Sequence, residues 1–339
     1  MRTILKSFVL NAFARLGIPR RLHRARFSDR LTILMYHGVV RSPLPIEDWC
    51  FLQEAAFREQ MHYLKAHFDV LPLSDAVSRL REGRISQPTA AITFDDGYQC
   101  VHDVCLPILS ELGLPATVYL TTAPVGTDET IWFCRLIDGL SETSKTRLEW
   151  DGREWDLAGP AAKSRACAEL QAALKERSPA ELERELAGIL RALGVAVDRH
   201  APPGSPFRLL DPPSIQAMAA GGLIAFGAHT HTHAILSRVP PEERRGEISR
   251  SVSEVERLAG RPCSTFAYPN GRSQDYDAPT MAALADLGIE TAVTTIEGPN
   301  DRLTPPLELR RYGIGSDLSS AGFQMLIHHT SSMLKREAS

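Results

Sequence analysis

The stretch AAITFDDGYQC, from Ala90 to Cys100, holds a short apolar strand that ends on two adjacent carboxylates, Asp95 and Asp96. Asp-Gly is common turn chemistry, so the stretch by itself predicts only a strand followed by a turn. Like charges side by side repel each other, and an opposite charge nearby favours the ionised form of both. The pair therefore lies either loose in solvent or beside a positive group.

The same pattern of an apolar strand followed by polar residues recurs along the chain and predicts the fold. Apolar, β-branched runs alternate with segments of helical periodicity, which is typical of βα units. The predicted strands are Leu31–Tyr36, Val70–Leu73, Ala90–Phe94, Ala116–Thr121, Leu223–Gly227, Ser264–Tyr268, Glu290–Thr295 and Leu309–Ile314. The predicted helices between them include Phe57–His67, Ser74–Glu82, Val101–Leu112 and Glu242–Ala259. Seven or eight such units predict a closed or nearly closed (β/α) barrel.

One long segment interrupts this alternation. Between about residues 126 and 213 no convincing strand is visible, and two stretches have helical periodicity. We expect a helical insertion at 126–213 within a barrel unit that spans 31–339. An apolar stripe predicts its buried face: Leu170, Leu174, Leu182, Leu186, Ile189 and Leu193.

The first 30 residues differ from the rest in charge. The formal net charge of the 339 residues is −3, but residues 1–30 hold eight Arg and Lys side chains and only one acidic residue, Asp29. This block is terminal and has few aromatic residues, so we expect no nucleic-acid partner. A basic, amphipathic arm either packs on the domain or lies on an anionic membrane surface, and both alternatives stay open.

We expect no cleaved signal peptide, because Lys6 and Arg15 interrupt the apolar stretch of the arm and no small-residue cleavage site follows it. The six cysteines lack the spacing that is typical of a disulfide framework, so we expect them to be free thiols in a reducing compartment. We therefore expect a cytoplasmic protein, with contact to the inner face of a membrane through residues 1–30 as the alternative left open.

A second strand end carries three alternating histidines, His229, His231 and His233. On a helical turn, His229 and His233 share a face; on an extended strand, all three point the same way. A His-rich turn without any metal is the plain alternative. Two imidazoles and one carboxylate make a metal site with open positions for water and substrate. If Asp96 is that carboxylate, the positive charge of the metal lets Asp95 stay ionised beside it and act as a base.

Two further strands also end on reactive side chains. STFAYPNGR, from Ser264 to Arg272, runs into Pro-Asn-Gly, and LTILMYHGV ends on Tyr36 and His37. In a barrel the carboxyl ends of the strands converge on one face, where catalytic loops lie. Four polar strand ends on one face predict an active site.

The combination of TFDDG at 93–97, HTHTH at 229–233 and FAYPNG at 266–271 resembles the polysaccharide deacetylase family, carbohydrate esterase family four. The resemblance covers residues 31–314 without the insertion. It implies a distorted (β/α) barrel of about seven strands and one divalent metal, which we expect to be Zn²⁺.

The resemblance also implies roles for individual residues. Asp95 matches the catalytic base, while Asp96, His229 and His233 match the metal ligands. Thr230 fits the position that steadies the histidine loop. Tyr268 and Pro269 fall where the family forms a substrate groove, with a backbone N–H near Tyr268 serving the oxyanion.

The chain departs from the family pattern at two positions. The third motif lacks an arginine, and we expect Arg311 to orient Asp95 in its place. The usual C-terminal motif of the general acid is also missing, and only His328 and His329 lie near the C-terminus. The pattern is closer to the permuted subgroup that resembles poly-N-acetylglucosamine deacetylases, in which the acid follows the first strand. This subgroup implies His37 as the acid.

The resemblance implies an enzyme that removes N-acetyl groups from a polysaccharide or a lipid-linked glycan and releases acetate. Two alternatives remain from the sequence. One is a deformylase or another amide hydrolase on the same scaffold, and the other is a carbohydrate-binding module without catalysis. The intact set of Asp95, Asp96, His229 and His233 disfavours the binding module, because a binder needs no base beside a metal.

Overall fold

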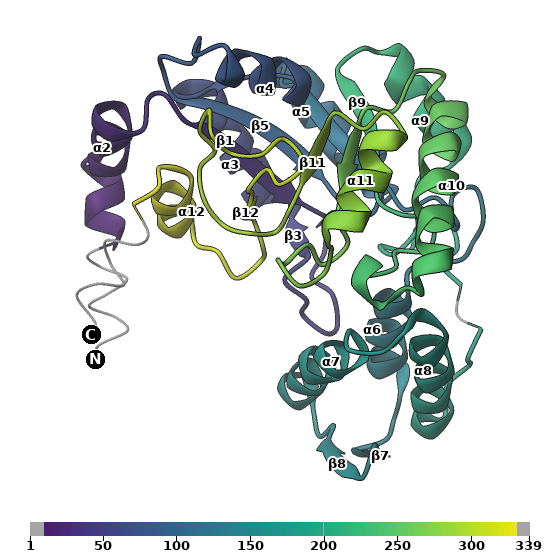
Figure 1. Ribbon diagram of the computed structural model, residues 1–339. Coiled ribbons are helices and arrows are strands. Elements are labelled where there is room, and N and C mark those ends of the chain that lie inside the picture. The colour runs from purple at the N-terminus through teal and green to yellow at the C-terminus, as the bar shows by residue number, and fades with distance from the viewer. Residues whose placement is uncertain (1–9, 199, 331–339) are drawn as a thin grey trace.

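The computed structural model describes residues 10–198 and 200–330 and is built around one curled parallel sheet (Figure 1). Along the sheet the strands follow the order β11-β10-β9-β6-β5-β1-β12, and β4 pairs with the beginning of β5. All pairs within this sheet are parallel. The strands are β1 (Leu31–Tyr36), β4 (Asp69–Val70), β5 (Thr89–Phe94), β6 (Ala116–Leu120), β9 (Ile224–Ala228), β10 (Thr265–Ala267), β11 (Thr291–Val293) and β12 (Tyr312–Gly313).

The sheet curls because one segment contacts both of its ends. The N–H of Thr294, just after β11, donates to the carbonyl of Leu309, and the N–H of Arg311 donates to Ile296. The next two residues, Tyr312 and Gly313, pair with Leu34 and Met35 of β1. The predicted distorted (β/α) barrel of about seven strands is therefore confirmed. Of the strand predicted over Val70–Leu73, only Val70 lies in the sheet, because the chain turns at Leu71 and Pro72 into α4, which begins at Leu73.

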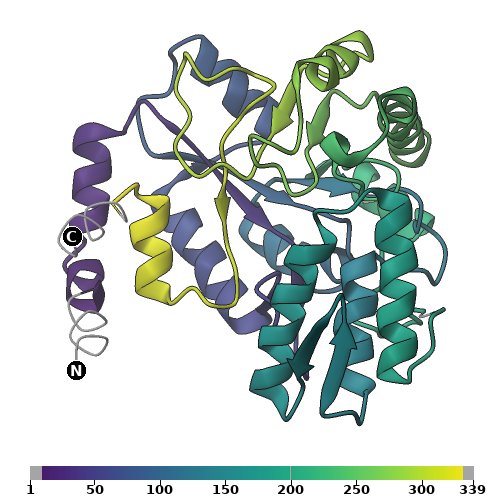
Figure 2. The same ribbon diagram turned by 60° about the horizontal axis from the view of Figure 1, so that its bottom comes forward.

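Helices surround the sheet, as two views of the molecule show (Figures 1 and 2). They are α3 (Glu54–His67), α4 (Leu73–Arg81), α5 (Leu106–Leu112), α9 (Pro212–Ala220), α10 (Pro241–Ala259), α11 (Ala278–Asp286) and α12 (Ser320–Ile327). The helix predicted over Val101–Leu112 begins as a π-helical turn, η1 (Val101–Cys105), and continues as α5. A short 3₁₀ turn, η2 (Leu236–Arg238), precedes α10.

The segment after β6 projects from the barrel as a helical unit (Figure 1). It contains α6 (Trp132–Glu142), α7 (Pro160–Leu174) and α8 (Pro179–Leu193). The predicted apolar stripe faces its core, with Leu182 half-buried and the other five leucine and isoleucine side chains buried. The unit also holds an antiparallel hairpin that the sequence did not indicate, β7 (Arg147–Trp150) and β8 (Arg153–Asp156).

A second small sheet joins this unit to the barrel. It pairs β2 (Gly38–Val40) with β3 (Phe51–Gln53) in parallel. The side chains of Val40 and Phe51 belong to the same apolar cluster as the core of the helical unit. The loop between β2 and β3 is therefore packed from both sides. The predicted start of the barrel unit at residue 31 and the predicted ends of the insertion at residues 126 and 213 stay predictions.

The described part of the basic arm packs against the C-terminal helix. It contains a helical segment at 10–15 and α2 (Ile18–Arg26), which lies beside α12 in both views (Figures 1 and 2). Residues 1–9 of the predicted arm lie outside the described residues. Among the described residues, no helix has both the length and the apolar character that crossing a bilayer requires.

A cluster of buried histidines forms this contact. Nδ1 of His23, on α2, lies 3.0 Å from Nδ1 of His328, and Nε2 of His328 lies 2.9 Å from the hydroxyl of Tyr63. The ring of His329 bonds the hydroxyl of Tyr312 at 2.8 Å. Burial lowers the pKa of His23 to about 4, that of His328 to about 2 and that of His329 to about 3. All three are therefore neutral at pH 7.

We predict that acid weakens the fold through this cluster. In the unfolded chain these histidines titrate near pH 6.5, so between about pH 6.5 and pH 4 the unfolded state binds more protons and stability falls as pH drops. Each histidine contributes up to about 1.4 kcal/mol per pH unit in this range. Urea unfolding between pH 4.5 and pH 7.5 should show a shallower acid loss for His328→Gln than for the native chain. The exposed His62→Gln is the matched control. An unchanged slope in His328→Gln contradicts the prediction.

Candidate active site

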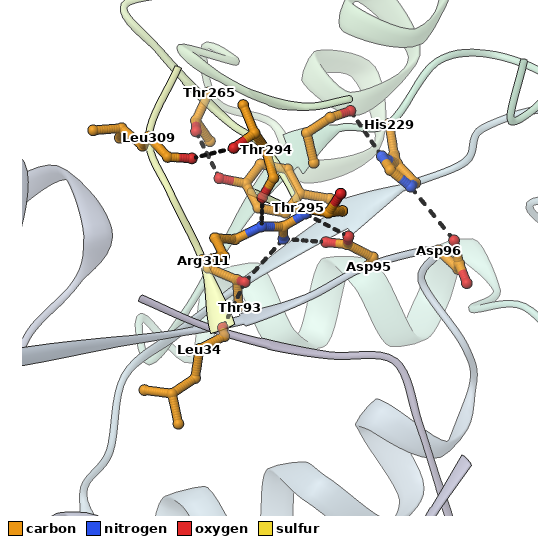
Figure 3. A network of polar contacts seen from close by, with 12 residues as sticks. Leu34, Thr93, Asp95, Asp96, His229, Thr265, Thr294, Thr295, Leu309 and Arg311 are labelled. Atoms are coloured by element: carbon orange, nitrogen blue, oxygen red, sulfur yellow. Dashed lines mark hydrogen bonds and ion pairs between the residues drawn. The ribbon is translucent and has the colours of Figure 1, made fainter. Parts of the chain in front are cut away.

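The carboxyl ends of neighbouring strands bring the candidate residues together (Figure 3). Asp95 and Asp96 follow β5, His37 follows β1 and His229 follows β9. Backbone hydrogen bonds set this arrangement, because the N–H of Asp95 donates to the carbonyl of Tyr36 at 2.9 Å. The N–H of His229 donates in the same way to Leu120 at 3.0 Å.

Arg311 holds Asp95 in a buried, bidentate ion pair. Nη1 and Nη2 of Arg311 each donate to one carboxylate oxygen at 2.7 Å, and both side chains are almost fully buried. The guanidinium also donates to the carbonyl of Thr294 and to the hydroxyl of Thr93. Burial opposes ionisation of Asp95, but Arg311 and His229 hold its pKa below the usual value. Of the two settings that the sequence left open for Asp95, solvent or a positive group, the structure shows a positive group, the guanidinium of Arg311.

The carboxylate of Asp96 faces two imidazole rings and is not held by a hydrogen bond from any other group of the described residues. Nε2 of His233 lies 3.2 Å and Nε2 of His229 lies 3.5 Å from Oδ1 of Asp96. Neither carboxylate oxygen accepts a well-formed hydrogen bond, although both are buried. The three ligand atoms lie within 4.8 Å of one another. Such a donor set fits a divalent cation, since a cation would satisfy the orphaned carboxylate and both ring nitrogens.

The tautomer of His229 supports the same assignment. Its Nδ1 lies 2.8 Å from the carbonyl of Ala267, which fixes Nδ1 as a protonated nitrogen and leaves Nε2 as the nitrogen that faces Asp96. Burial disfavours a charged Asp96, yet His229 and His233 hold its pKa well below the usual value. Asp96 is therefore ionised at neutral pH.

The loops of the site adopt conformations that few side chains tolerate. Asp96, Thr230 and His233 all have φ between 60° and 70°, in the left-handed region. A non-glycine residue there costs on the order of 1 kcal/mol or more, and such residues cluster at functional sites. His229 and His233 converge through this irregular loop, rather than through the helical turn or the strand that the sequence left open.

His231 is turned away from the cluster. Its Nδ1 lies 2.9 Å from the hydroxyl of Thr122, and its backbone N–H donates to Glu247 at 3.1 Å. Glu247 also accepts from the N–H of Thr232. The carbonyl of Thr230 accepts from the N–H of Thr122 at 3.4 Å, which ties the histidine loop to the end of β6. The sequence did not indicate Glu247, because its contribution depends on the packing of α10 on this loop.

His37 lies in the same site, whereas His328 does not. The Nδ1 of His37 is buried without a hydrogen-bond partner. Burial lowers the pKa of His37, and the nearby Asp96 and Asp95 raise it in part, with a net decrease. His328 and His329 instead contact α2, α3 and β12. Of the two positions considered for the general acid, only His37 therefore adjoins the carboxylates.

The side chain of Tyr268 lies in the core, and its place along a substrate groove stays a prediction. Its ring stacks on Tyr276 at 4.2 Å, its hydroxyl donates to Leu307, and its N–H donates to the carbonyl of Val293. Pro269 is buried as well and has no N–H. The amide of Asn270, with φ of 62°, has no hydrogen-bond partner among the described residues, so it is the free N–H nearest to Tyr268.

A cavity of about 760 Å³ extends from the cluster to the helical unit. Its wall includes His233 and Thr232 on the histidine loop, and Trp132, Arg135 and Lys175 on the helical unit. The ring of Phe133 packs on His233 at 5.6 Å between centroids. This volume suits a small-molecule or sugar ligand.

Comparison with known proteins identifies the family of this chain. Residues 82–292 match the model of the family described as polysaccharide deacetylase. A segment of 105 residues is 32% identical to the poly-β-1,6-N-acetyl-D-glucosamine N-deacetylase of Staphylococcus epidermidis. That segment is 31% of this chain and spans only 35% of the length of the relative. The match supports the subgroup predicted from the sequence.

Solved structures show the same fold at low sequence identity. The deacetylase PplD of Streptococcus pyogenes, in complex with acetate, is 18% identical, with a TM-score of 0.58 over 88% of this chain and 98% of that one. IcaB from Ammonifex degensii is 17% identical, with a TM-score of 0.56 over 89% and 98% of the two chains. These likenesses establish the architecture of the barrel.

Proposed function

This chain belongs to the polysaccharide deacetylase family, and on that premise we propose that it is a metal-dependent hydrolase. Its substrate would be an amino-sugar-containing polysaccharide or lipid-linked glycan, from which it removes N-acetyl groups and releases acetate. One observation carries the proposal: the buried cluster of Asp96, His229 and His233 lies beside a carboxylate, Asp95, that is fixed by Arg311. The relative from Staphylococcus epidermidis is named for the same reaction on poly-β-1,6-N-acetyl-D-glucosamine.

Asp96, His229 and His233 would hold the divalent cation, which we propose is Zn²⁺. One carboxylate oxygen and two imidazole nitrogens form the mixed donor set that Zn²⁺ accepts in catalytic sites. When bound, the cation would acidify a water molecule and polarise the amide carbonyl.

The residues of the chain would divide the proton transfers between them. Asp95 accepts a proton from the attacking water, and its low pKa keeps it in the required carboxylate form. The free N–H of Asn270 donates to the oxygen that gains negative charge. His37 donates a proton to the departing amine, because the developing negative charge beside it favours its protonated form.

We predict that the chain releases acetate from N-acetylglucosamine oligosaccharides and that Asp95→Asn nearly abolishes this activity. The substitution keeps the shape of the side chain and removes the base, and general acid–base groups contribute about 10²–10⁴-fold. Acetate is measured by a coupled assay, and the exposed Asp103→Asn serves as the control.

The products separate this function from its alternatives. Formate from an N-formyl sugar, with no acetate from N-acetyl sugars, would instead identify a deformylase. Oligosaccharide binding without any turnover would identify a binding module. Either result contradicts the proposed deacetylation.

We predict that metal binding depends on His229 and not on His231. His229→Ala removes one of three ligands, so the purified protein should lose nearly all of its Zn²⁺ in elemental analysis. His231→Ala should keep it, because His231 contacts Thr122 and Glu247 instead of Asp96. Chelation should abolish acetate release, and added Zn²⁺ should restore it. Equal metal loss in both variants contradicts the ligand assignment.

We also propose that the enzyme acts in the cytoplasm and that its basic arm rests on an anionic membrane surface. Phe13 and Leu16 are 39% and 65% exposed, and the arm around them carries exposed arginines with no acidic side chain before Asp29: Arg15, Arg21, Arg24 and Arg26. Exposed apolar side chains flanked by cations are typical of helices that bind in the headgroup region.

We predict that the full chain sediments with vesicles that contain anionic lipid and not with zwitterionic vesicles. Removing the apolar contacts in Phe13→Ser/Leu16→Ser should lower the bound fraction several-fold, and high salt should lower it as well. Leu303→Ser is the matched control, because Leu303 is 90% exposed outside the arm. If Leu303→Ser weakens binding as much as the double change, or if zwitterionic vesicles bind equally, the arm does not recognise an anionic surface.

A further inference from the structure

Trp49 stands exposed beside the proposed general acid. It lies in the loop between β2 and β3, and 43% of the residue is accessible to solvent. Single exposed apolar residues are common on proteins and need no function. Trp49 differs from such residues because its ring meets the ring of His37 at 5.0 Å in an edge-to-face contact. An exposed indole therefore adjoins the reacting centre.

The loop that carries Trp49 is held rigidly from two sides. The carbonyl of Trp49 accepts from the N–H of Ser316 at 3.1 Å, and the carbonyl of Asp48 accepts from the hydroxyl of Ser316. The carboxylate of Asp48 accepts from the N–H of Cys50 and from Nε2 of Gln171, which belongs to α7 of the helical unit. Little conformational entropy would be lost when a ligand binds such a fixed side chain.

The C-terminal segment supports one edge of the indole and leaves the rest open. A Cβ on Gly315 would lie 3.1 Å from Cε3 of Trp49, and one on Gly313 would lie 3.6 Å from Cζ3. The backbone at these two glycines therefore packs directly against the ring. The indole N–H has no hydrogen-bond partner among the described residues, so it can donate to a ligand.

We propose that Trp49 forms a sugar-binding subsite next to His37, on which a pyranose ring of the glycan stacks. The C–H face of a pyranose is apolar and its rim carries hydroxyl groups, which match the indole face and its free N–H donor. The subsite would hold the sugar unit that neighbours the reacting N-acetyl group. This inference rests on the proposed deacetylation, because it names how the same site recognises its glycan.

The test compares a glycan substrate with a substrate that has no sugar. Trp49→Ala should raise KM for a β-1,6-linked oligosaccharide of N-acetylglucosamine about tenfold and change kcat less than about twofold. Trp49→Phe should recover most of this loss, since it restores an aromatic face. Hydrolysis of the small ester 4-methylumbelliferyl acetate should be unchanged in both variants. Leu303→Ala is the control, because Leu303 is an apolar side chain that is 90% exposed and lies on another loop, between β11 and β12.

Binding without turnover keeps the two proposals separate. Calorimetry on the Asp95→Asn protein should show that adding Trp49→Ala weakens oligosaccharide binding about tenfold. Unchanged binding overturns the subsite, even if acetate release is established. Absence of acetate release overturns the proposed function, even if binding depends on Trp49. An equal fall of kcat on both substrates would mean that Trp49 only positions His37, and this result also overturns the subsite.

Discussion

The buried ion pair between Asp95 and Arg311 is the interaction on which both the fold and the site depend. Burying a charge is costly unless it is paired, and removing one partner of such a pair typically costs about 3–5 kcal/mol. Here Asp95 follows β5, while Arg311 precedes β12 and also donates to the carbonyl of Thr294 beside β11. One guanidinium therefore joins the central strand to the two ends of the sheet. The same side chain, Arg311, links the strands of the curled sheet and orients the carboxylate proposed as the base. A change at Arg311 would therefore affect both the sheet and Asp95.

The candidate cation-binding cluster of Asp96, His229 and His233 depends on a different constraint, the backbone of two loops. Asp96 and His233 both have left-handed backbone conformations, and neither is glycine. Such strain persists only where surrounding contacts fix the loop. The contacts are visible here: Glu247 of α10 accepts two backbone N–H groups of the histidine loop, and Thr122 contacts both Thr230 and His231. The orphaned oxygens of Asp96 are therefore held in place by the fold rather than by any hydrogen bond of their own.

The sequence predicted the barrel well because each strand is short, apolar and followed by a polar turn. The strand Leu31–Tyr36 has the predicted bounds, and the other predicted strands overlap strands of the sheet, although Val70–Leu73 does so only at Val70. The partners of Asp95 and Asp96 could be proposed because strand ends converge in such a fold. The hairpin β7–β8 escaped prediction, since its strands are four residues long and mostly exposed. The burial of the Tyr268 side chain could not be predicted, because a motif gives the position of a residue along the chain and not the direction of its side chain. The histidine cluster under α2 joins residues about 300 positions apart, which periodicity does not report.

The residues proposed for catalysis lie on the barrel, whereas part of the proposed substrate-binding surface lies on the helical unit. The loop that carries Trp49 packs against both. The candidate ligands and the base lie on strand ends of the barrel, whereas one wall of the cavity belongs to the helical unit after β6. The apolar core of that unit includes Cys50 and Phe51, which follow Trp49 directly. Gln171 on α7 also bonds Asp48, the residue before Trp49. A change in the packing of α7 would therefore move the indole relative to His37 without displacing Asp95, which Arg311 fixes independently of α7. Under the proposed function, sequence changes in the helical unit would alter which glycan is bound, while the proposed reacting groups keep their geometry.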